Sequence, residues 1–224
     1  MLANGNHKFI GHNFPFIITS LVAIFVTFQF FLQGSVGIFS DLMKKDLDLD
    51  AAAISLLSSS FFYSYILLQV PAGIIIDRLA LSKVIPFTVL GLSCSCLLLS
   101  FCTHVKYAII LRIVMGAFSC FAFLGLLACI KKYFSSVRFA FIMSIAESGG
   151  MFGIALFNII FSRLAESYTW QISLLTCSVL MFILFFAILF VFRFEPKINL
   201  SPDGEIEDSS SLDRKDSSIK SLLS

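Results

Sequence analysis

The stretch Gly73-Ile74-Ile75-Ile76-Asp77-Arg78 ends one long apolar segment shortly before the next one begins. The carbonyl end of a helix carries partial negative charge, so a carboxylate is disfavoured there unless a cation or the positive end of another helix lies near it. Arg78, Lys83 or the N-terminus of a neighbouring helix is therefore the expected partner of Asp77. Gly73, one turn earlier, leaves room for a neighbouring helix to approach closely. The stretch therefore predicts a contact between two membrane helices that can form and break.

The composition of the whole chain places these apolar segments in a lipid bilayer. Of the 224 residues, 58% are hydrophobic and only 13% are charged, and the mean hydropathy is +0.95. A soluble domain of this size has too little interior to hide so much apolar surface. The lipid bilayer is therefore the first expected partner of the chain.

Six apolar segments are each long enough to cross a bilayer, which takes roughly 20 predominantly apolar residues. They cover residues 14–39, 52–76, 84–103, 107–130, 139–161 and 169–192. The predicted fold class is an all-α, polytopic membrane protein with six transmembrane helices in a domain over residues 14–194.

The two ends of the chain differ from this domain. Residues 1–13 are too polar for a secretory leader, and no small-residue cleavage site follows the first apolar segment, so that segment is expected to be retained. Residues 195–224 are rich in Ser, Asp and Glu and contain no aromatic residue, which predicts a disordered tail. A short surface helix over 217–223 is the alternative for the end of this tail.

The basic residues indicate how the helices cross the membrane. If the N-terminus is cytoplasmic, eleven of the 16 Lys and Arg residues lie on that side, four lie on the other side, and Arg112 lies within a span. The positive-inside rule then places both termini in the cytoplasm. The expected location is a bacterial inner membrane.

Several kinds of chemistry are not expected of this sequence. All six cysteines lie in or beside apolar segments and behave as small hydrophobic residues, so neither a disulfide nor a metal site is predicted. No pairing of a nucleophile with a base and no phosphate-binding loop indicates an enzyme. The prediction is a non-enzymatic protein without a cofactor, in which coupling to protons or another ion remains open, and without a nucleic-acid partner.

Polar side chains inside membrane spans normally face the interior of the bundle or a wet cavity. They concentrate in the first, second, fourth and fifth spans, so the third and sixth are expected to be peripheral. The candidate residues for a cavity that holds solute or protons are Gln29, Gln33, Tyr63, Arg112, Glu147 and Asn158. The two glutamines share a helix face, where they can bind a polar solute or equally clamp a neighbouring helix.

Arg112 and Glu147 are the charged members of this set. An arginine inside a span must be paired or must face water, so Arg112 is interpreted as a residue that binds an anion or relays charge, with snorkelling to the surface as the alternative. Burial raises the pKa of a carboxyl group, so Glu147 is a candidate proton carrier or a partner of Arg112. Four glycines are expected to allow close helix packing: Gly116, Gly149, Gly150 and Gly153.

These motifs resemble the N-terminal half of a transporter of the major facilitator superfamily. That family has the loop motif G-x-x-x-D-R-x-G-R-K, which is matched in part, by Gly73, Asp77 and Arg78. The final Gly-Arg-Lys of the motif is replaced by Ala80, Leu81 and Ser82, and Lys83 directly after them restores a basic residue. The family's R-x-x-x-G motif is matched by Arg112 and Gly116. The glycines of the fifth span lack the proline of the antiporter motif, so antiport is not supported. Residues 62–73 resemble organic-anion symporters and the phagosomal amino-acid transporters of intracellular bacteria.

The resemblance implies a fold and a function. The fold would be one six-helix half, itself an inverted repeat of three helices and three helices. The function would be secondary active transport of a small polar solute, an organic anion or an amino acid, by alternating access and by symport. In this reading the conformational-switch motif consists of Gly73, Asp77, Arg78 and Lys83.

Transporters of this kind have two six-helix halves, whereas this chain has six predicted spans. Three interpretations remain open: a truncated product, a half that pairs with a separately encoded second half, and a homodimer. The alternative from another functional class is a membrane scaffold or partner-binding subunit that transports nothing.

Overall fold

A computed structural model describes residues 3–195, 199–200 and 206–207, with the side chains described from residue 14 to residue 195. It contains seven helices, namely α1 (Ala3–Ile38), α2 (Ser40–Leu47), α3 (Ala51–Arg78), α4 (Leu81–Ser100), α5 (Val105–Tyr133), α6 (Ser136–Ser167) and α7 (Trp170–Phe192). Two-residue strands, β1 (Asn199–Leu200) and β2 (Ile206–Glu207), pair antiparallel after the last helix. The segment 217–223, the candidate surface helix, lies outside the described residues.

The prediction of six membrane spans is confirmed. Six helices, α1 from Phe14 onward and α3 to α7, are long and apolar enough to cross a membrane. The helices are longer than the predicted spans at several ends, and α1 continues back to Ala3 through the polar N-terminal segment. The short helix α2 was not predicted, because its eight residues are mostly polar and lie between two spans.

Local side-chain chemistry sets several of the helix ends. The Asp50 carboxylate accepts a hydrogen bond from the Ala53 amide at 2.7 Å and so caps the start of α3. The Thr169 hydroxyl accepts from the Ile172 amide at 3.3 Å and caps α7 in the same way. Asp48, in the left-handed conformation with φ of 50°, ends α2 and turns the chain toward α3.

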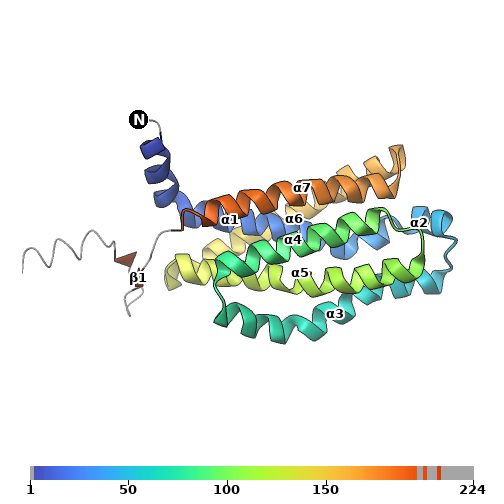
Figure 1. Ribbon diagram of the computed structural model, residues 1–224, viewed down its shortest axis with the longest axis horizontal. Coiled ribbons are helices and arrows are strands. Elements are labelled where there is room, and N and C mark those ends of the chain that lie inside the picture. Colours follow the sequence, from blue (N-terminus) through green and yellow to red (C-terminus); the bar gives the residue numbers. More distant parts are fainter. Residues whose placement is uncertain (1–2, 196–198, 201–205, 208–224) are drawn as a thin grey trace, which may run out of the picture.

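The helices run roughly along one direction, with α1 and α5 at the centre (Figure 1). The helix α5 packs against α1, α3 and α4, and α1 also packs against α6 and α7. The helices α3 and α6 therefore form the two flanks of the bundle, and each rests mainly on one central helix. We call the end of the bundle where α3, α5 and α7 end the basic end; α2 lies at the other end.

Within this bundle the third and sixth spans, which were expected to be peripheral, are not the most exposed helices. In α4, 12 of the 20 residues are buried, whereas in α6 only 3 of the 32 residues are buried. A small polar residue also joins α4 to α7: the Ser178 hydroxyl donates to the Ser93 carbonyl at 3.0 Å. The helices that remain most exposed are α3 and α6, which carry many of the polar side chains.

Candidate functional site

Arg112 of α5 lies at the point where α1, α3 and α5 meet. Its side chain is fully buried. One terminal nitrogen donates to the Leu32 carbonyl at 2.7 Å and the other to the Gln33 carbonyl at 3.2 Å. The guanidinium also lies over the Phe61 ring, 4.8 Å from its centroid. These contacts tie α5 to α1 and α3 by a single side chain.

The positive charge of Arg112 has no carboxylate partner among the described residues. Its hydrogen-bond acceptors are two backbone carbonyl groups of α1, whose oxygens carry partial negative charge. The aromatic face of Phe61 adds further stabilisation by a cation–π interaction. The charge is therefore held by dipoles and a ring, which leaves it able to attract an anion.

The two glutamines of α1 lie beside this arginine. The Gln29 amide nitrogen donates to the Gln33 side-chain oxygen at 3.0 Å, and the Gln33 backbone carbonyl accepts from Arg112. Two buried atoms of this arginine–glutamine cluster (Arg112, Gln29 and Gln33) have no hydrogen-bond partner: Nε of Arg112, a donor, and Oε1 of Gln29, an acceptor. An unmatched buried donor and acceptor are costly, so the cluster has hydrogen-bonding capacity that the described residues do not use.

Glu147 lies on α6 and is not joined to Arg112. Its side chain is half-buried, and its buried Oε1 oxygen has no hydrogen-bond partner. No ion pair links it to Arg112 in the described part of the chain. The arrangement does not contain the Arg112–Glu147 pair that the sequence offered as one alternative, and it leaves the carboxyl group without a fixed partner.

The remaining predicted cavity residues lie apart from the arginine–glutamine cluster. Tyr63 is on the outer face of α3, with 65% of its surface exposed. Asn158 lines an open cavity of about 480 Å³ along α6, together with Arg163 and Glu166. The predicted set is therefore divided between the bundle centre and its two flanks.

The residues of the predicted switch motif lie at the basic end, where α3 ends and α4 begins. Asp77, Arg78 and Lys83 are exposed, and none of them forms an ion pair with another described residue. A Cβ atom built on Gly73 would have no atom within 4 Å. The close helix neighbour that Gly73 was expected to admit is thus not one of the described helices.

Three of the four predicted packing glycines lie where two helices meet. A Cβ on Gly116 would collide with the Phe61 carbonyl oxygen, so this glycine lets α5 approach α3 closely. A Cβ on Gly153 would lie 2.7 Å from Thr27 Cγ2, and one on Gly150 would lie 3.7 Å from Thr27 Oγ1, so these two bring α6 onto α1. Gly149 faces open space.

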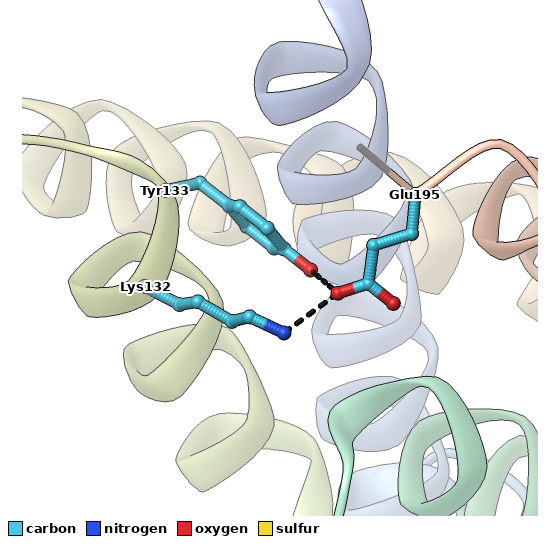
Figure 2. A network of polar contacts seen from close by, with 3 residues as sticks. All are labelled: Lys132, Tyr133 and Glu195. Carbon is cyan, nitrogen blue, oxygen red and sulfur yellow. Dashed lines mark hydrogen bonds and ion pairs between the residues drawn. The ribbon is translucent and has the colours of Figure 1, made fainter. Parts of the chain in front are cut away.

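A polar network that the sequence analysis missed joins α5 to the segment after α7 at the basic end (Figure 2). One Glu195 oxygen accepts from Lys132 Nζ and from the Tyr133 hydroxyl, both at 2.6 Å. The Tyr133 ring packs edge-on against Phe14 of α1, with centroids 5.2 Å apart.

The sequence analysis also missed Phe61 and Thr27. No polar pattern marks Phe61 or Thr27, although a Lys-Tyr pair at a span end is a signal for such a network.

Comparison with known proteins places these features in a family. The family model described as the Major Facilitator Superfamily matches residues 18–223. An uncharacterized transporter of Bacillus subtilis (strain 168), YybO, is 22% identical over 178 residues, which is 79% of this chain and 41% of that protein. A probable galactarate/D-glucarate transporter of the same organism, GudP, is 23% identical over 211 residues, 87% of this chain and 46% of that protein. The chain thus spans less than half the length of these relatives.

Proposed function

Because the chain belongs to the major facilitator superfamily, we propose that it forms one six-helix half of a secondary transporter that moves a small polar solute by alternating access. The chain is an integral membrane protein with six apolar helices of spanning length. The observation that carries the proposal is the buried charge of Arg112, which only helix carbonyls and a ring stabilise.

The proposed solute is a small organic anion, with an amino acid as the second class. A buried cation without a carboxylate partner favours a solute that brings negative charge. The unmatched acceptor on Gln29 and donor on Arg112 suit a solute that also carries hydroxyl or amino groups. The printed name of one relative, a probable galactarate/D-glucarate transporter, supports the same class.

We assign proton coupling and symport to Glu147. Glu147 is a carboxyl group inside a membrane span, and one of its oxygens is buried without a hydrogen-bond partner, so it is free to take up a coupled proton. Because Arg112 does not neutralise it, Glu147 can exchange a proton without breaking an ion pair. No cofactor is required for this coupling.

The proposed partner is a second six-helix unit against α3 and α6, supplied by a separate half or by a second copy. Both helices present polar side chains on exposed faces, among them Tyr63, Gln69 and Ser148. Such groups are costly against lipid, whereas a second unit would enclose them around a wet pathway. The proposed orientation has both termini in the cytoplasm of a bacterium, supported by the excess of cations at the basic end.

Uptake of labelled glucarate into vesicles tests the proposal, with the second unit supplied and a pH gradient imposed. Glu147→Gln cannot carry a proton, so we expect gradient-driven uptake to fall at least tenfold while exchange of internal for external solute continues. Glu166→Gln, an exposed position at the far end of the same helix, is the matched control and should retain uptake. Unchanged gradient-driven uptake in Glu147→Gln would remove its proposed role.

A further inference from the structure

A cleft at the basic end lies outside the proposed solute pathway. It has a volume of about 430 Å³ and is formed by the end of α3, the start of α4 and one residue of α5. Its walls are apolar, formed by Ile75, Leu79, Val84, Phe87 and Phe121. Leu79 and Phe87 are more than half exposed, which leaves the cleft open to the surroundings of the bundle.

One charged residue, Lys83, lines this apolar cleft. Lys83 forms no ion pair within the part of the chain that the structure describes. It lies in the first turn of α4, where no acidic residue and no capping side chain offsets the positive end of the helix. The hydroxyl of Thr88, which also lines the cleft, already donates to the Ile85 carbonyl at 2.9 Å.

The charges around the cleft are mostly positive, like the charge of Lys83. Among the described residues the basic end carries six Lys and Arg side chains against two carboxylates, Asp77 and Glu195, whereas the opposite end carries four against five. Glu195 is bound to Lys132 and Tyr133, and Asp77 is not among the residues that line the cleft. A negatively charged group is therefore attracted to this end and can reach Lys83.

We propose that this cleft binds one anionic phospholipid. The phosphate would lie at Lys83 and the start of α4, and an acyl chain would lie along Ile75, Val84 and Phe121. Basic pockets between membrane helices recognise anionic head groups, and the apolar walls select a ligand that carries a hydrocarbon chain. A free phosphate would gain nothing from those walls, so a lipid fits the cleft better than a soluble anion. The cleft shares Lys83 with the predicted switch motif, but none of the residues that line it belongs to the proposed solute site.

Native mass spectrometry of the full chain in mild detergent tests this inference by titration with phosphatidylglycerol or phosphatidylcholine. We expect one phosphatidylglycerol to be retained in preference to phosphatidylcholine. Lys83→Ala should weaken this binding about fivefold, the effect of one basic residue near an anionic lipid, and Lys83→Arg should preserve it. Lys131→Ala is the matched control, because Lys131 is an exposed lysine at the same end outside the cleft.

Four results would overturn the proposal. Equal retention of the two lipids would show that the head-group charge is not recognised. Equal losses in Lys83→Ala and Lys131→Ala would show a general surface attraction instead of a site. A doubled protein mass without bound lipid, with Lys83 protected from chemical labelling, would assign the cleft to a second copy of the chain. Competition by glycerol phosphate at the same concentration as the lipid would also contradict the role of the apolar walls.

Discussion

At the scale of single residues, the environment of Arg112 explains how a guanidinium can be buried without a carboxylate. Its planar fork reaches two successive carbonyls of α1, Leu32 and Gln33, and its face lies on Phe61. A lysine has a single ammonium and cannot reproduce this fork. The same side chain therefore has a structural role in the bundle and a proposed role toward an anion.

Replacing Arg112 with lysine is expected to lower the free energy of unfolding by roughly 1.5 to 3 kcal/mol, the usual value of one charged hydrogen bond. The physical reason is the loss of one of its two bonds to α1. Reversible unfolding in mixed detergent measures the change. Arg163→Lys, at an exposed position, is the control and should stay near wild type. Similar stabilities for the two variants would contradict the structural role of the fork.

At the scale of elements, glycines decide how closely the flanking helices approach the central ones. Gly116 lies against the backbone of α3, and Gly153 lies against Thr27 of α1. With few residues of α6 buried, this small contact is an important part of what holds α6 in place. A Cβ atom built on Gly149, four residues before Gly153 on the same helix, would have no atom within 4 Å, so this glycine provides an internal comparison.

Gly153→Leu is expected to destabilise the bundle by about 1 to 3 kcal/mol, because the added side chain must push α6 away from Thr27. Gly149→Leu should leave the stability unchanged or raise it slightly, since it faces open space and removes a helix-weakening glycine. Thermal unfolding of both variants in detergent measures the difference. Thr27→Ala should restore part of the loss in Gly153→Leu but not alter Gly149→Leu, and additive effects at 27 and 153 would argue against the contact.

At the scale of the whole molecule, the two flanking helices α3 and α6 are far less covered than the other membrane helices. The helices α4 and α7 are joined by the hydrogen bond from the Ser178 hydroxyl to the Ser93 carbonyl, whereas α3 and α6 present exposed faces. The chain also spans less than half the length of the relatives it resembles. These observations support the proposal that a second six-helix unit packs against α3 and α6.

Cross-linking in membranes tests which face is covered. Leu67 on α3 and Phe186 on α7 are both strongly exposed, at 76% and 63%. Leu67→Cys should form a cross-linked product with a second six-helix unit, while Phe186→Cys, which faces lipid in the proposal, should not. The mass of the product distinguishes a second copy from a separate half. Cross-linking at Phe186 alone would place the partner on the opposite side.

The sequence alone determined the number and position of the membrane helices, because span length and hydropathy are local properties of consecutive residues. It also placed Arg112 and Glu147 inside spans and Gly73, Asp77 and Arg78 at a span end. Only the tertiary structure decided that Arg112 binds α1 carbonyls and not Glu147, and that Tyr63 and Asn158 lie on the flanks. Those outcomes depend on how each helix rotates and on which neighbour it meets, and no pattern along a single helix specifies either.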